Sequence, residues 1–111
     1  MTDRGAIERE LLAWMQDEPQ LHDDARFERL ALALFAFQFG ANPPYGRFCA
    51  ARGATPASVG SWREIPAVPT GAFKELPLRC FPAERVRHVF RTSGTSLARR
   101  GELQLDTLAL Y

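Results

Sequence analysis

The chain has 111 residues, which suits one domain or part of one, because domains commonly hold about 100–150 residues. Hydrophobic residues make up 46% of the sequence and charged residues 24%, which excludes a disordered or fibrous protein. The net charge of +1 argues against a general nucleic-acid binder, whose binding surface needs a strong surplus of basic residues.

Two amphipathic helices are expected first. Asp3 can cap a helix that runs through about Met15, since apolar residues recur there at helical spacing. Asp23 or Asp24 can cap a second helix that ends near Gly40.

The second half of that second helix, LALALFAFQF (residues 30–39), alternates like a strand. Its alanine content and its continuous amphipathic lead-in favour a helix instead. Because this stretch is apolar on all sides, we expect it to lie at the centre of the core.

A break at Asn42-Pro43-Pro44 precedes an expected short helix from about Tyr45 to Arg52. Thr55-Pro56 then predicts a short turn toward Trp62. The segment REIPAVPTGAFKELPL (residues 63–78) holds three prolines, which remove amide donors, so an ordered irregular run is expected there.

The last third changes to short β-type patterns. LRCF (78–81) and VRHVFR (86–91) predict two strands separated by a turn, and alternation places Arg87 and Arg91 on one strand face. LQLDTLALY (103–111) has the pattern of a helix that begins and then stops at the last residue. We therefore expect the chain to be truncated at its C-terminus.

Cysteine content and hydropathy indicate the cellular setting. Cys49 and Cys80 form no CxxC motif and stand at no metal-ligand spacing, so two free, mostly buried thiols and no metal site are expected. The acidic N-terminus does not resemble a signal peptide, and the longest apolar run, residues 30–37, is too short to span a bilayer. These features predict a cytoplasmic protein.

The most informative motif follows the second predicted strand. The hydroxyls of Thr92, Ser93, Thr95 and Ser96 surround Gly94, and a loop of this kind can point its amide hydrogens and hydroxyls at a phosphate. An ordinary Ser/Thr turn is the alternative. The glycine and lysine spacing of a Walker loop is absent.

Charge supports the phosphate interpretation. Residues 85–101 contain five arginines and no acid, and such a cluster is either a solvated face or an anion site. Arg99 and Arg100 follow the hydroxyl-rich stretch directly. We therefore predict an anion-binding site made of the following residues: Thr92, Ser93, Gly94, Thr95, Ser96, Arg99 and Arg100.

Three stretches carry a resemblance to a known family: IPAVPTGAFKELPL, VFRTSGTS and GELQLDTLALY, in chain order. Together they resemble the acyl-protein synthetase family, within the adenylate-forming superfamily. These are the long-chain fatty acid ligases of bacterial bioluminescence and their relatives. Residues 92–96 match the first five positions of the superfamily loop [ST]-S-G-[ST]-[ST]-G, and the resemblance covers residues 65–111. Leu97 replaces the usual glycine and no lysine follows. Arg99 and Arg100 are therefore the candidates to bind phosphate in place of that lysine.

The change from helical to alternating periodicity near Leu78 predicts an α+β fold, with a helical N-terminal part followed by a short β element and the phosphate loop. The resemblance implies that this fold is a fragment of the adenylate-forming N-terminal domain. Residues 1–111 would be the N-terminal subdomain of an acyl-activating enzyme, with the remainder of its own chain as a partner. The implied activity uses ATP and Mg²⁺ to convert a carboxylic or fatty acid to an acyl-adenylate, whose acyl group passes to a thiol. An acyl-acceptor protein is a further partner that the resemblance implies. Neither Cys49 nor Cys80 matches the family's acyl-accepting cysteine.

Two other interpretations stay open. The chain could be a non-catalytic module that binds an anion or docks to a partner protein. It could also be a helical adaptor in which the TSGTS sequence is a surface turn.

Overall fold

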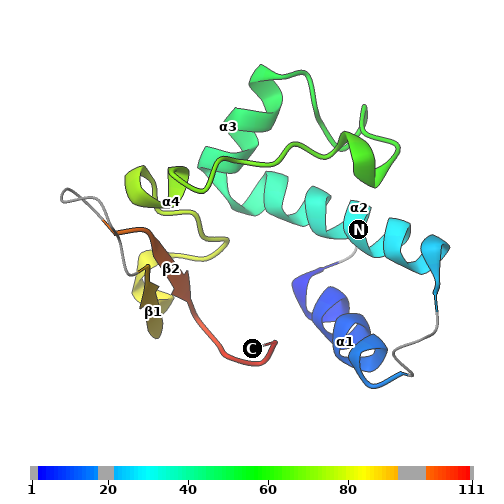
Figure 1. The fold of residues 1–111 in the computed structure, drawn as a ribbon, viewed down its shortest axis with the longest axis horizontal. Coiled ribbons are helices and arrows are strands. Elements are labelled where there is room, and N and C mark those ends of the chain that lie inside the picture. Colours follow the sequence, from blue (N-terminus) through cyan, green and yellow to red (C-terminus); the bar gives the residue numbers. More distant parts are fainter. Residues whose placement is uncertain (1–2, 18–21, 93–99, 111) are drawn as a thin grey trace.

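The computed structural model describes residues 3–17, 22–92 and 100–110 (Figure 1). It is a small α+β structure whose mostly helical N-terminal part precedes a two-stranded antiparallel hairpin, and this confirms the predicted class. Its described helices and strands are α1 (Arg4–Met15), α2 (Asp24–Ala41), α3 (Pro43–Ala51), η1 (Trp62–Glu64), α4 (Ala72–Glu75), η2 (Ala83–Arg85), β1 (His88–Arg91) and β2 (Glu102–Leu105). In these residues no helix is long and apolar enough to cross a membrane.

Side-chain caps set the starts of the three long helices. The carboxylates of Asp3 and Asp23 accept hydrogen bonds from backbone amides in the first turns of α1 and α2, at 2.8 and 2.9 Å. Asn42 ends α2 and caps α3, which begins with Pro43 and Pro44. The third helix therefore starts two residues earlier than predicted, because the first helical positions need no amide donor and tolerate proline.

The core lies around α2, as predicted. α2 packs against α1, α3 and η1, and its middle is helical in spite of the alternating sequence. A buried cluster joins α2 and α3 to the following loop through Phe35, Tyr45, Cys49 and Val59. The Tyr45 hydroxyl donates to the Pro66 carbonyl at 2.8 Å, which holds the proline-rich segment on the core.

Two sequence-based predictions in the last third are wrong. Residues 78–81 form no strand; they run irregularly, and Arg79 Nε donates to the Phe81 carbonyl within the same segment. Residues 102–105 form strand β2 where a helix was expected, because β1 pairs with them. The helical spacing of the leucines is a local signal, and cross-strand pairing with a distant segment overrides it.

Candidate functional site

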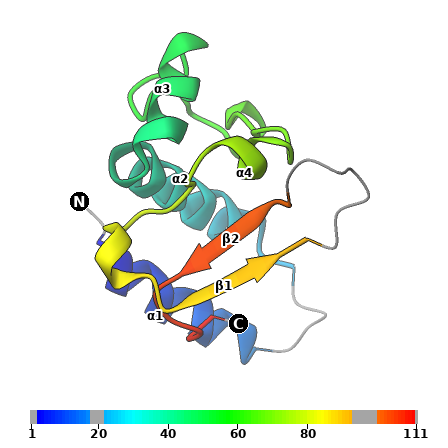
Figure 2. The same cartoon turned by 90° about the vertical axis from the view of Figure 1, so that its left-hand side faces the viewer.

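The predicted phosphate loop is the connection between the two strands of the hairpin. β1 and β2 pair with His88 opposite Leu105 and Arg91 opposite Glu102, and the pairing continues to Thr92 and Gly101 (Figure 2). The Thr92 amide donates to the Gly101 carbonyl at 3.0 Å, and Thr92 Oγ1 accepts from the Gly101 amide at 2.9 Å. The hairpin thus brings Thr92, the first residue of the hydroxyl-rich stretch, next to Gly101.

Only two of the predicted site residues can be placed. Thr92 closes the hairpin, and Arg100 lies exposed immediately before Gly101. The others, Ser93, Gly94, Thr95, Ser96 and Arg99, lie outside the described residues.

Gly101 is buried between the opposite strand and α4. A Cβ at this buried position would lie 3.4 Å from Thr92 Cγ2 and 3.6 Å from Phe73 Cβ. These are van der Waals distances to side chains on both sides, so Gly101 is enclosed between the opposite strand and α4. α4 packs directly on the loop end of the hairpin (Figure 2).

A cavity of about 470 Å³ opens between α4 and the hairpin. We call it the basic cavity, and it is lined by Phe73, Lys74, Glu75, Leu76, Pro77, Arg91, Arg100, Glu102 and Gln104. Arg91 Nε lies 3.8 Å from Glu102 Oε2. The side chains of Lys74 and Arg100 make no ion pair with any other described residue. Three cationic side chains from separate segments make this cavity suited to an anion with several oxygens.

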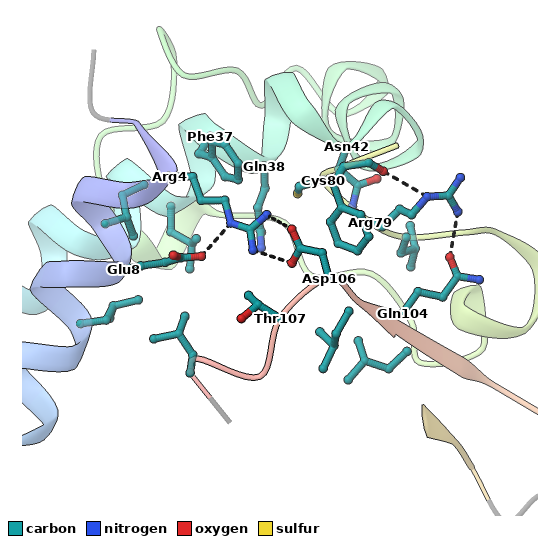
Figure 3. Close-up of a pocket in the computed structure, with 18 residues that line it drawn as sticks. Arg4, Glu8, Phe37, Gln38, Asn42, Arg79, Cys80, Gln104, Asp106 and Thr107 are labelled. Atoms are coloured by element: carbon teal, nitrogen blue, oxygen red, sulfur yellow. Dashed lines mark hydrogen bonds and ion pairs between the residues drawn. The ribbon is translucent and has the colours of Figure 1, made fainter. Parts of the chain in front are cut away.

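A second cavity, of about 350 Å³, lies among α1, α2, residues 78–81 and the end of the chain from β2 onward (Figure 3). We call it the apolar cavity, since nine of its lining residues are aliphatic or phenyl side chains: Ile7, Leu11, Leu34, Phe37, Leu78, Phe81, Leu103, Leu105 and Leu110. Its volume falls in the range of about 300–1,000 Å³ that small-molecule sites occupy. Gln104 lines both this cavity and the basic cavity, so the two adjoin.

A charged cluster closes one edge of the apolar cavity (Figure 3). Both terminal nitrogens of Arg4 donate to the two Asp106 carboxylate oxygens at 2.6 Å, and Arg4 Nε donates to Glu8 Oε1 at 2.7 Å. The hydrogen bonds from Arg4 hold the pKa of Asp106 below its ordinary value. This pair ties the first helix to the residues that follow the last strand.

A second arginine contact involves Gln104, the residue that lines both cavities. Arg79 donates from a terminal nitrogen to Gln104 Oε1 at 2.8 Å (Figure 3). The irregular segment 78–81 is thereby attached to β2. Gln104 lines both cavities, so this hydrogen bond holds a residue that the two cavities share.

Both cysteines are free thiols, as predicted. Cys49 is fully buried in the α2–α3 cluster, and Cys80 lines the apolar cavity. Burial raises the pKa of the Cys80 thiol, which keeps it protonated at neutral pH. Neither thiol lines the basic cavity.

The structure brings to the site groups that the sequence patterns did not place there. Lys74 lies in the proline-rich segment, which contributed to the family resemblance. It was not among the residues predicted to bind an anion, yet it lines the basic cavity. Of the two arginines expected on one strand face, Arg91 lines the basic cavity, whereas Arg87 precedes β1 and donates to the Glu84 carbonyl.

Searches against protein-family models, curated proteins and solved structures find no match to this chain.

Proposed function

We propose that this chain is the N-terminal part of an ATP-dependent acyl-protein synthetase. The enzyme would activate a carboxylic acid as an acyl-adenylate and transfer the acyl group to a thiol. The observation that carries the proposal is the position of the connection between β1 and β2, because Arg91 before it and Arg100 near its end both line the basic cavity. Sequence resemblance and cavity charge thus support the same ligand, the triphosphate of ATP.

In this proposal the loop holds the β- and γ-phosphates while the substrate carboxylate attacks the α-phosphate. Negative charge builds on the departing pyrophosphate, so hydroxyl, amide and guanidinium donors stabilise the transition state without acting as bases. Residues 92–96 would supply the hydroxyl and amide donors, and Arg99 and Arg100 the cationic ones.

Magnesium is compatible with the residues of the basic cavity. Proteins usually hold Mg²⁺ through one or two carboxylates together with substrate phosphates, and Glu75 and Glu102 both line this cavity. Bound there with ATP, the ion would neutralise phosphate charge.

The apolar cavity supports a fatty acid as the substrate. Its lining suits an alkyl chain, and it adjoins the basic cavity at Gln104, so a chain bound in one would lie next to phosphates bound in the other. The acyl acceptor would be a thiol other than Cys49 or Cys80, because Cys49 is buried and neither cysteine lines the basic cavity.

A non-catalytic anion-binding module is the second candidate. Among the described residues, the basic cavity offers groups that bind an anion but no thiol that could accept an acyl group. Such a module would bind ATP or inorganic triphosphate and catalyse no adenylation.

ATP–pyrophosphate exchange with medium- and long-chain fatty acids tests the proposal, measured on the product of the complete reading frame that contains this chain. Thr95→Ala should lower the exchange rate by about 10²–10³, the usual effect of removing one donor to a developing oxyanion. Arg100→Ala should lower it similarly and weaken ATP binding. The exposed Thr70, outside both cavities, gives the matched control Thr70→Ala, which should exchange normally.

ATP binding without exchange in the unmodified protein would favour the non-catalytic module. An unchanged exchange rate in a folded Thr95→Ala variant would show that the TSGTS sequence is only a surface turn. Residues 1–111 alone should show no exchange, because the family's adenine, ribose and acyl-acceptor regions would lie elsewhere in the enzyme.

A further inference from the structure

Lys74 is the single lysine of the chain, in which the other thirteen basic residues are arginines. It lies on α4, outside the hydroxyl-rich connection, and its exposed side chain lines the basic cavity with Arg91 and Arg100. α4 packs against β2 at the loop end of the hairpin. The lysine is therefore placed at the predicted phosphate site by tertiary packing.

The charges in this cavity are only partly balanced. Arg91 has a carboxylate at 3.8 Å, whereas Lys74 and Arg100 pair with none of the described residues. Glu75 and Glu102 also line the cavity, so three cations face two carboxylates and the lining keeps a net positive charge that attracts an anion. An ammonium on a flexible stem can adjust to a phosphate chain in several positions, since its three donors rotate freely.

We infer that Lys74 binds a phosphate oxygen of a triphosphate held in the basic cavity. It would supply, from α4, the contact given by the lysine that usually follows the Ser/Thr-rich loop in the superfamily this sequence resembles. The inference rests on the proposed function, which assigned that contact to Arg99 and Arg100. With Lys74, the proposed triphosphate site includes a residue of the proline-rich segment.

Calorimetric titration of the 111-residue chain with inorganic triphosphate at low ionic strength is the first test. Replacing Lys74 by glutamine should weaken binding about tenfold, the effect of losing one charge-assisted hydrogen bond at an exposed site. Lys74→Arg should keep most of the affinity. The matched control is Arg47→Gln, which removes one exposed charge on α3 outside both cavities and should change affinity by less than about twofold.

A second measurement needs no variant. Because the chain has one lysine, its ε-amine can be followed by mass spectrometry during acetylation with a water-soluble active ester. Triphosphate should lower the acetylation rate of Lys74 in proportion to the occupied fraction of the site. The acetylation rate of the α-amino group should stay unchanged.

The outcomes separate this inference from the proposed function. If the unmodified chain binds no triphosphate, the phosphate site itself is wrong and the inference fails with it. If the chain binds triphosphate but Lys74 is not protected and Lys74→Gln binds like Arg47→Gln, only the role of Lys74 is refuted. Protection together with a selective loss of affinity would establish the contact.

Discussion

The helical part and the hairpin part of this chain are stabilised in different ways. In the helical part Phe35 is 3% exposed and lies in a closed aromatic and aliphatic cluster with Tyr45. In the hairpin Phe90 and Leu103 stand opposite each other, and each is about 40% exposed. The hairpin packs on α4 and is further attached by polar contacts, from Arg79 to Gln104 and from Arg4 to Asp106, the residue after β2.

This difference shows how stability and function are divided in the chain. Burial of apolar surface supplies most folding free energy, so the α2–α3 cluster should carry the stability. An isolated two-stranded hairpin is marginal in water, and this one depends on its contacts with α1, α4 and the irregular segment. The candidate site therefore lies on the less stable part, where binding sites are commonly found.

The largest expected effect is a contrast between two phenylalanines. Phe35→Ala should lower the free energy of unfolding by about 3–5 kcal/mol, because it leaves a cavity in a buried cluster. Phe90→Ala should cost about 1 kcal/mol or less, since a half-exposed cross-strand contact is lost. Urea denaturation followed by circular dichroism measures both, and equal losses would contradict the proposed division.

Two glycines test the packing of α2 on α3. A Cβ at Gly46 would lie 2.5 Å from the Phe39 carbonyl oxygen, so Gly46→Ala must push the helices apart and should cost about 1–3 kcal/mol. Gly40, in the last turn of α2, has no atom within 4 Å of such a Cβ. Gly40→Ala should stabilise by up to about 1 kcal/mol, because alanine favours the helix. Thermal melting of the two variants should move in opposite directions.

The Arg4–Asp106 pair tests the polar attachment of the hairpin. Asp106→Asn should cost about 1–2 kcal/mol at pH 7, the loss of charge-assisted hydrogen bonds at a mostly buried carboxylate. Asp17→Asn is the control: Asp17 also pairs with an arginine but its side chain is 47% exposed, so the cost should be below about 1 kcal/mol.

The same pair predicts a pH dependence. Arg4 lowers the pKa of Asp106 in the folded state, so the stabilisation is complete above the unfolded pKa of about 3.9 and is lost as pH falls through the folded value. The stability difference between the unmodified chain and Asp106→Asn should therefore be constant near neutral pH and shrink below about pH 4. A difference that persists unchanged to pH 2 would refute the ion pair as its source.

The sequence by itself determined the helices and one end of the candidate site. Asp3 and Asp23 cap α1 and α2 through bonds to amides three residues away, and such local signals can be read along the chain. The hydroxyl-rich stretch and Arg100 were likewise recognisable, because their chemistry is carried by neighbouring residues. The class of the fold followed from the same local patterns.

Tertiary structure decided the rest. Residues 102–105 became a strand only because β1 lies beside them, and residues 78–81 remained irregular in spite of a strand-like sequence. Lys74 reached the basic cavity because α4 packs on β2, a strand that begins 27 positions after α4 ends. Arg4 and Asp106 are 102 positions apart. Contacts between such distant residues form only when the whole chain folds, and no local periodicity encodes them.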